Sequence, residues 1–217
     1  MSKATMRLPN ARHEAHPWVI AQVAPDFKLL DVWGLPAEGR ADEFATLVEI
    51  VTSLDPAKGD SRATRALFSL RWRLGAWFGW DDAASKPSVP SRSETTLSAR
   101  VPEDLRDTVT RPIVVGSTKF VPVYRTDDEW AAEISNSTVH AVMHLAWVEE
   151  GEGVYRGQMG VYVKPRGRFG ATYMALIGPF RHLIVYPALM RQIARAWDAR
   201  PRSDQIRKAP SDLRRCM

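Results

Sequence analysis

The stretch Leu183-Ile-Val-Tyr-Pro-Ala-Leu-Met-Arg-Gln-Ile-Ala-Arg-Ala-Trp197 decides the fold class, because its apolar residues recur every three or four positions. That spacing places them on one face of a helix. The apolar stripe comprises Leu183, Tyr186, Met190, Ile193 and Trp197. Pro187 removes a backbone N–H and is expected to kink the helix about one turn from its start, and Pro201 marks its end. The stretch predicts a long amphipathic C-terminal helix that packs its apolar face against another element.

The chain before this helix is rich in strand and turn signals. Asn136-Ser137 and the Gly-Glu-Gly sequence at 151–153 are typical of hairpin turns, and Pro165-Arg-Gly167 closes a third hairpin. Pro122 indicates a strand at a sheet edge, because proline cannot donate to a ladder. The expected strands span residues 97–101, 120–124, 130–135, 138–148, 154–164 and 169–177. Together they predict an antiparallel sheet.

The N-terminal part predicts one strand followed by two helices. Residues 26–33 have the apolar content of a strand, which Gly34-Leu-Pro36 should end. Residues 41–54 predict a helix, with an apolar stripe made of Phe44, Leu47, Val48 and Val51. A second helix is expected over residues 62–78, and an exposed loop rich in Ser and Pro over 81–96.

Length and composition favour a single globular domain. The chain has 217 residues, of which 45% are apolar and 25% charged. The predicted class is α+β, with an antiparallel curved sheet around the long C-terminal helix and two helices after the first strand. We expect a flexible N-terminal tail over residues 1–17, one domain over 18–198 and a basic C-terminal tail over 199–217.

Charge and composition also exclude several function classes. The net charge of +5 divides into +2 over residues 1–17, +3 over 198–217 and zero over the body, so nucleic-acid binding is not expected. The sequence contains no apolar run long enough for a membrane span. The single Cys216 excludes an internal disulfide and a cysteine-based metal site. Without an apolar signal segment, a cytoplasmic protein is expected.

The polar motifs predict neither a metal nor a cofactor. His13-Glu-Ala-His16 is one residue short of the zinc-protease helix signature and falls in the expected tail. The glycines between 151 and 157 lack the dinucleotide-binding spacing. The acidic residues 127–129 suit solvated turn positions. His140 and His144 lie about 13 Å apart in an extended strand, too far for one ion, and a structural or solvated role on the outer face or at a covered edge is expected.

The stretches from Leu70 to Asp82, from Glu133 to Leu145 and from Tyr173 to Pro187 resemble a family of uncharacterised bacterial domains. That family is grouped with the helix-grip superfamily of START-like and polyketide-cyclase-like proteins, and the resemblance covers about residues 16–198. It implies a helix-grip fold over 18–198, with a cavity for an apolar small molecule. Because the family also occurs joined to short-chain reductase-like domains, which this chain lacks, it implies a separate partner reductase. It brings no catalytic residues.

We therefore expect the chain to bind an apolar or amphipathic small molecule in a cavity between the sheet and the C-terminal helix. The expected ligand-binding residues are Trp33, Met143, Trp147, Met159, Tyr173, Arg181, His182, Leu183, Tyr186 and Met190. Two alternatives stay open. One is an enzyme of cyclase or dehydratase type whose acid or base is Asp31, His182, Tyr173 or Tyr186. The other is a non-catalytic accessory module for a reductase.

The start of the C-terminal helix carries a more specific prediction. A helix that begins near Pro179 has Arg181 and His182 in its first turn. His182 and Tyr186 are four residues apart and share a helix face, so a polar pair is expected at the cavity mouth. Arg181 is expected to turn outward, toward an acidic side chain or a ligand carboxylate.

Overall fold

The structure is a computed structural model, and it describes residues 6–54, 96–108, 113–115, 118–135, 139–166, 178–179 and 181–201. Three predicted elements lie outside these ranges: the helix over 62–78, nearly all of the loop over 81–96, and the strand over 169–177, which contains Tyr173. The predicted C-terminal tail lies outside them from residue 202 onward.

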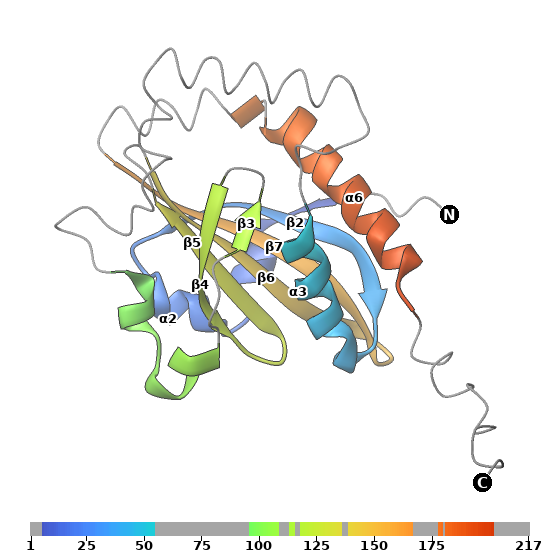
Figure 1. The fold of residues 1–217 in the computed structure, drawn as a ribbon, viewed down its shortest axis with the longest axis horizontal. Helices are drawn as coiled ribbons and strands as arrows, with labels where there is room; N and C mark the ends of the chain where they lie inside the picture. Colours follow the sequence, from blue (N-terminus) through green and yellow to red (C-terminus); the bar gives the residue numbers. More distant parts are fainter. Residues whose placement is uncertain are drawn as a thin grey trace, which may run out of the picture.

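The described strands form a seven-stranded antiparallel sheet in the order β1-β2-β7-β6-β5-β4-β3 (Figure 1). They are β1 (Met6–Leu8), β2 (Lys28–Gly39), β3 (Ile113–Val115), β4 (Thr118–Arg125), β5 (Glu129–Ser135), β6 (Val139–Gly151) and β7 (Val154–Pro165). The last four pair with their neighbours in sequence, and the turn signals at 136–137 and 151–153 predicted the pairing of β5 with β6 and of β6 with β7. β2 then pairs with β7 and brings the N-terminal half of the chain into the same sheet.

The hairpin between β6 and β7 turns at residues 151–153, where the sequence predicted it. Gly151 and Gly153 have φ angles of 116° and 71°, and Glu152 between them has a φ of 55°. Positive φ angles cost glycine little, so the Gly-Glu-Gly sequence fixes the position of the turn. The hairpin pairs His144 of β6 with Gly160 of β7.

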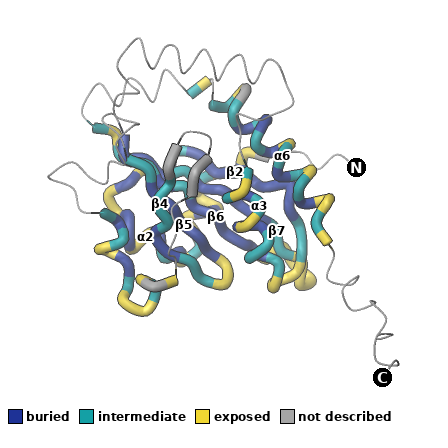
Figure 2. Tube along the Cα trace, viewed as in Figure 1, coloured by how far each residue is buried: buried dark blue, intermediate teal, exposed yellow. Residues whose placement is uncertain are grey.

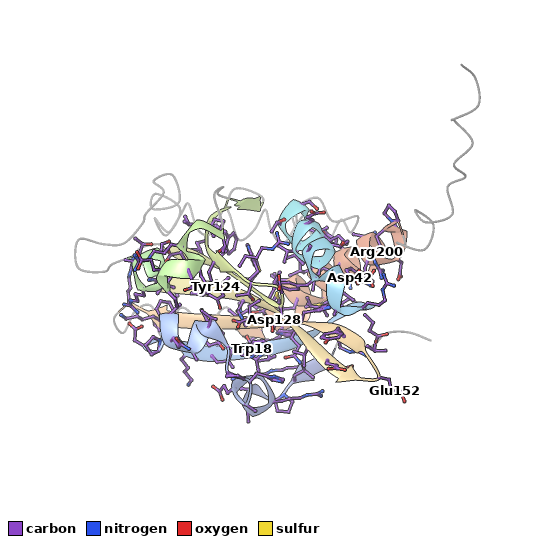
Figure 3. All side chains as sticks on the ribbon, turned by 90° about the horizontal axis from the view of Figure 1, so that it is seen from below. Trp18, Asp42, Tyr124, Asp128, Glu152 and Arg200 are labelled. Atoms are coloured by element: carbon purple, nitrogen blue, oxygen red, sulfur yellow. The ribbon has the colours of Figure 1, made fainter. Side chains whose placement is uncertain are left out.

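Helical segments cover both faces of the sheet. They are α1 (Asn10–Glu14), α2 (Val19–Val23), the 3-10 turn η1 (Ala41–Glu43), α3 (Phe44–Ser53), the 3-10 helices η3 (Leu97–Arg100) and η4 (Glu103–Thr108), the π-helix η5 (Arg181–Val185) and α6 (Tyr186–Ala199). Figure 3 shows α3 and α6 on one side of the strands and the N-terminal helical segments, with Trp18, on the other. We call the first side the α6 face and the second the α2 face.

Each face buries its own apolar cluster, so the central strands are buried on both sides (Figure 2). Successive residues of a strand point to opposite faces. On β6, Leu145 and Trp147 join the α6 face, whereas Val142 and Ala146 join the α2 face. The α3 residues predicted to be apolar and inward, Phe44, Leu47, Val48 and Val51, are buried on the α6 face. The α+β class with a C-terminal helix on the sheet is therefore confirmed.

The predicted N-terminal tail is wrong from residue 6 onward. β1 pairs with β2, where Arg7 lies opposite Trp33. α1 then buries His13 completely, and the indole of Trp18 donates a hydrogen bond to the His13 carbonyl at 2.8 Å. A three-residue strand and two five-residue helices are too short to show a hydrophobic period, so the sequence pattern gave no sign of them.

β2 is longer than predicted. The expected break at Pro36 is wrong, because the strand continues to Gly39. Its register against β7 shifts between Gly34 and Glu38. In such an irregular stretch the ladder is interrupted, so the missing N–H of Pro36 is tolerated.

Two further predictions concern the region around β4. The strand predicted over 97–101 is wrong, because the 3-10 helix η3 occupies this segment; the Thr96 hydroxyl starts it by accepting the Ser98 N–H at 3.1 Å. Pro122 lies beyond residues 118–120, to which the pairing of β3 with β4 is confined in the described sheet. Its lack of an N–H therefore disturbs no β3 bond, but β4 lies between β5 and β3, so the predicted edge position of this strand is wrong.

The C-terminal helix has two parts. α6 begins at Tyr186 with Pro187 in its first turn, and the π-helix Arg181–Val185 precedes it, so Pro187 lies where two helix types meet. The stripe residues Tyr186, Met190, Ile193 and Trp197 are buried, as predicted. Leu183 is 75% exposed, and its predicted place on the stripe is wrong. The wider turns of a π-helix break the spacing of three and four there. α6 ends before Pro201, as expected.

Candidate functional site

A buried carboxylate lies on the α6 face of β2. Strand alternation turns Asp31, Trp33 and Leu35 toward α6. The Asp31 side chain is 1% exposed. A carboxylate removed from water is strongly disfavoured unless other groups balance its charge, so its partners define the site.

Four side chains from three elements surround the two oxygens of Asp31. Arg7 of β1 contacts Oδ1 at 3.1 Å, and His182 of η5 contacts the same oxygen at 3.3 Å. Arg181 of η5 forms an ion pair with Oδ2, and the Tyr186 hydroxyl of α6 donates to Oδ2 at 3.5 Å. We call these five side chains the Asp31 cluster. It ties the start of the C-terminal helix to the sheet.

The π-helix explains why three of these residues reach one carboxylate. Residues five apart in an α-helix point in directions about 140° apart. A π-helix closes i→i+5 hydrogen bonds, so residues five apart lie close to one turn apart and on the same side. Arg181 is the first residue of η5, and Tyr186 follows it by five. The change of helix type thus directs Arg181 and Tyr186 to the same side as His182.

The aromatic rings of the site pack against one another. The Trp33 ring lies 4.8 Å from that of Tyr186 and 5.7 Å from that of His182, centroid to centroid. His182 and Tyr186 meet edge to face at 5.7 Å. The predicted contact between them is therefore present, but the Tyr186 hydroxyl donates to Asp31 and His182 Nε2 contacts the other Asp31 oxygen, so the expected polar pair does not form. Arg181 does find an acidic partner, as expected, yet it turns inward and is only 14% exposed.

Three N–H groups of this site have no acceptor. Among the described residues, Trp33 Nε1 and both Nε and Nη1 of Arg181 are buried without a hydrogen-bond partner. Arg181 and Trp33 both lie against the Tyr186 ring, with the Arg181 guanidinium carbon 5.8 Å from its centroid. The site therefore offers donors and no free carboxylate oxygen, since the four partners of Asp31 already occupy both oxygens.

Tyr186 acts as a donor in this arrangement. Burial raises its pKa to about 12, with the Arg181 charge opposing the shift and Asp31 supporting it. The phenol thus keeps its proton throughout the neutral range and can donate it to Asp31. Its hydroxyl is therefore one of the four groups that hold the carboxylate in place.

The other predicted ligand-binding residues lie in different places. Trp147, Met159 and Met190 belong to the buried cluster of the α6 face, and Met143 packs against it. Leu183 is exposed and does not join them. Tyr173 lies outside the described residues. Of the five predicted methionine and tryptophan side chains, the structure therefore places Trp33 and three others in one buried cluster with Tyr186, and Met143 packs against that cluster.

On the α2 face, polar side chains form a continuous chain of hydrogen bonds. His13 contacts one residue with each of its ring nitrogens. Its Nδ1 lies 3.1 Å from Gln158 Oε1, and its Nε2 lies 3.1 Å from His144 Nδ1. His144 Nε2 lies 3.1 Å from Glu129 Oε2, and the Tyr124 hydroxyl donates to that oxygen at 2.8 Å. We call these five side chains the Glu129 chain. The two histidines and Gln158 are fully buried.

Glu129 is the acceptor at the end of this chain. A charged carboxylate only accepts hydrogen bonds, so Nε2 of His144 donates to it, as the Tyr124 hydroxyl does. The N–H of Val19 donates to the same carboxylate at 3.0 Å. Donors from β6, β4 and α2 therefore hold Glu129 in place.

The same contacts set the pKa values on this face. Burial, assisted by neighbouring His144, lowers the pKa of His13 to about 4. Burial alone would raise the pKa of Glu129, but hydrogen bonds from His144, the Val19 N–H and Tyr124 outweigh it and hold that pKa below its usual range. Burial and the adjacent carboxylate raise the pKa of Tyr124 far above its usual range. Near neutral pH, His13 is therefore neutral and Glu129 is charged.

A second carboxylate–histidine pair lies on the same two strands, β5 and β6. His140 Nε2 is 2.8 Å from Glu133 Oε2. Glu133 also accepts the Thr96 hydroxyl at 3.0 Å and the Leu97 N–H at 3.3 Å. All four residues are buried or partly buried. The pair thus holds the start of η3 against the sheet.

The two pairs share one design. Glu129 accepts the N–H of Val19, the first residue of α2, as Glu133 accepts that of Leu97 in η3. Each glutamate therefore binds the start of a helical segment. Of the structural or solvated role expected for His140 and His144, the structure shows the structural one, because these segments cover the face on which both histidines lie buried. A sequence signal was present: acidic residues four apart on one strand and histidines four apart on the next.

The structure shows no metal centre and no membrane helix within its described ranges. No group of three or more His, Cys, Asp or Glu side chains there is arranged to hold a metal ion. Of the helices in those ranges, none has the length and apolar character to cross a membrane. His13 and His16, which the sequence places in an incomplete zinc signature, have separate environments: His13 belongs to the Glu129 chain and His16 stacks on Trp18 at 4.8 Å.

A family model described as "Protein of unknown function (DUF2867)" matches residues 23–188. This region is more than half of the chain and contains Asp31, Arg181 and Tyr186, whereas Arg7 and His13 precede it. No curated protein and no solved structure matches the chain.

Proposed function

We propose that this chain, which belongs to the DUF2867 family, binds an apolar or amphipathic small molecule between the sheet and α6. The polar end of the ligand lies at the Asp31 cluster, and its apolar part lies along the side chains beneath α6. The observation that carries the proposal is the set of three buried N–H groups without an acceptor, on Trp33 and Arg181.

The free-energy cost of leaving these N–H groups without an acceptor supports the binding of a ligand. A buried N–H left without a partner costs about 1–3 kcal/mol, and more when it belongs to a charged group. Two other buried indoles on this face have an acceptor: Trp147 donates to the Arg40 carbonyl at 2.9 Å and Trp197 to the Glu38 carbonyl at 3.0 Å. An acceptor supplied by a ligand gives Trp33 and Arg181 the partner that the described residues do not.

The surroundings suit the apolar part of such a ligand. Trp33, Met159 and Met190 are apolar neighbours within the cluster of the α6 face. Methionine side chains adapt to irregular shapes and favour aromatic partners. The antiparallel sheet with a C-terminal helix across one face also supports the finer proposal of a helix-grip domain, whose ligand would lie between these two elements.

Native mass spectrometry of the purified chain, with a binding panel of fatty acids, sterols and polyketides, tests the proposal. We expect a retained small molecule or a binder from the panel. Trp33→Phe removes one unused donor and keeps an aromatic ring, so it should weaken binding by up to about tenfold, the loss of one hydrogen bond.

Trp197→Phe is the matched control. It makes the same chemical change on the same face, but the indole it removes already donates to the Glu38 carbonyl. This variant should lose stability and keep the affinity of its folded fraction. Failure of every ligand to bind, or equal affinities of the two variants, would contradict the proposal.

A cyclase or dehydratase is the second candidate, because Asp31 contacts both His182 and Tyr186. A general base needs a free oxygen near the substrate. Both Asp31 oxygens are already held by two partners each, including two arginines. The geometry therefore favours binding over catalysis at this carboxylate. Turnover of a bound polyketide by the wild-type chain, abolished in Asp31→Asn, would reverse that preference.

A further inference from the structure

We infer that the polar end of the ligand is a carboxylate, so that the chain binds organic acids with an apolar body. This inference rests on the proposed function and narrows it to one class of ligand. It comes from the charge balance of the Asp31 cluster, from the kind of hydrogen-bonding groups left over there, and from the way Arg181 is held.

The charge balance leaves one positive charge without a partner. Within the described residues, Arg7 and Arg181 both pair with Asp31, and Asp31 is the one carboxylate in contact with either of them. Arg7 is 58% exposed and is solvated in part, whereas Arg181 is 14% exposed. A guanidinium that is mostly withdrawn from water needs a full negative charge nearby, and Asp31 shares its charge with two. A second carboxylate restores the balance.

The unused groups are donors throughout. Arg181 offers Nε and Nη1, and Trp33 offers Nε1. A carboxylate brings two oxygens that accept and no N–H or O–H that would itself need an acceptor. An alcohol brings a donor to a place where the Asp31 oxygens are already occupied, and an ammonium group would be repelled by both arginines. An ester or ketone accepts hydrogen bonds but supplies no charge.

Arg181 is also held ready for such a group. Its Nη2 is fixed on Asp31 and its guanidinium lies over the Tyr186 ring. The π-helix orients it toward the sheet, and π-helical turns occur frequently at functional sites. A guanidinium already fixed by one carboxylate loses little further freedom when it binds another, and arginine pairs with carboxylates through several strong N–H bonds.

Isothermal titration with four probes that share one tail tests this inference: decanoic acid, decanol, methyl decanoate and decylamine. We expect decanoic acid to bind at least about tenfold tighter than decanol or the ester, with no detectable binding of the amine. Higher salt should weaken the binding of decanoic acid and leave the binding of decanol unchanged, because only the acid binds through its charge.

Two arginine variants locate the effect. Arg181→Met should bring the affinity for decanoic acid down to that for decanol. Arg200→Met is the matched control: Arg200 follows α6, pairs with Glu43 and lies over the Trp197 ring, away from the Asp31 cluster. It should keep the preference for the acid.

The possible results separate the inference from the proposed function. If the wild-type chain binds acid and alcohol equally, the carboxylate assignment is wrong and small-molecule binding stands. If none of the four probes binds and the broader panel fails too, both are wrong. The order of the four affinities measured for the wild-type chain tests the carboxylate assignment even if Arg181→Met does not fold.

Discussion

On the α2 face, the buried carboxylate of Glu129 accepts hydrogen bonds from His144, the Tyr124 hydroxyl and the Val19 N–H. On the α6 face, the buried carboxylate of Asp31 faces two arginines, and three N–H groups near it have no acceptor. Within the described residues, the one buried polar atom of the Glu129 chain without a hydrogen-bond partner is the neutral amide nitrogen of Gln158.

The difference separates a structural network from a site. The Glu129 carboxylate is held by donors of the fold itself, and the Glu129 chain fastens α1 and α2 to the sheet. The Asp31 cluster fastens η5 and α6 in the same manner, but it retains a surplus of charge and donors. The contrast predicts that changes on the α2 face alter stability alone, whereas changes on the α6 face alter binding.

The largest effect is expected from Glu129→Ala. It leaves His144, the Tyr124 hydroxyl and the Val19 N–H without their buried acceptor, and each buried donor left unpaired typically costs about 1–3 kcal/mol. Urea denaturation measures the loss. Asp128→Ala is the control. The Asp128 carboxylate is exposed and accepts the Thr126 hydroxyl, so the loss of stability should stay below about 1 kcal/mol. Equal losses in the two variants would break the comparison.

The next effect concerns pH and belongs to the α2 face. The pKa of His13 is about 4 in the folded chain and near 6.5 when unfolded, so between these values the unfolded state binds more protons. Stability therefore falls as pH falls from 6.5 to 4, by about 3 kcal/mol in all. The lowered pKa of Glu129 adds a further loss below its usual range.

Urea midpoints between pH 7 and pH 4 measure this dependence in matched variants. His13→Gln should remove most of the slope between pH 6.5 and 4. His16→Gln, which changes a partly exposed histidine three residues away, should keep it. A slope that survives in His13→Gln would show that another group is responsible.

The smallest effect is expected from Tyr186→Phe on the α6 face. It removes one neutral hydroxyl from Asp31 and should weaken ligand binding by about 1 kcal/mol, with little loss of thermal stability. Titration calorimetry and a thermal melt of the same sample check both. A sharp fall in the melting temperature with unchanged affinity would mean that Tyr186 is structural, like the Glu129 chain.

The sequence predicted elements whose pattern is long and local. The helix over residues 41–54 and four strands were found because each shows its own period over several residues. The pairing of Arg181 with an acidic side chain, the closeness of His182 to Tyr186 and the candidacy of Asp31 came from helix spacing and residue chemistry. Neither helix spacing nor residue chemistry could predict that Asp31 contacts the start of the C-terminal helix.

What the sequence could not supply is contact between distant segments. His13 and His144 are 131 residues apart and meet because of the register of β6 and β7 and the short N-terminal helix. Arg7 reaches Asp31 by the pairing of a three-residue strand. The π-helix Arg181–Val185 departs from the regular spacing of three and four, so that spacing mispredicted Leu183.

The indole region of a ¹H–¹⁵N NMR spectrum tests the central claim most directly. On titration with decanoic acid, the Trp33 indole N–H should shift strongly as it gains an acceptor, with the assignment taken from Trp33→Phe. The indole signals of Trp18 and Trp197, which already donate to backbone carbonyls, should stay in place. A Trp33 signal that does not move while decanoic acid binds, or equal shifts of all three, would contradict the claim that the Asp31 cluster is the ligand site.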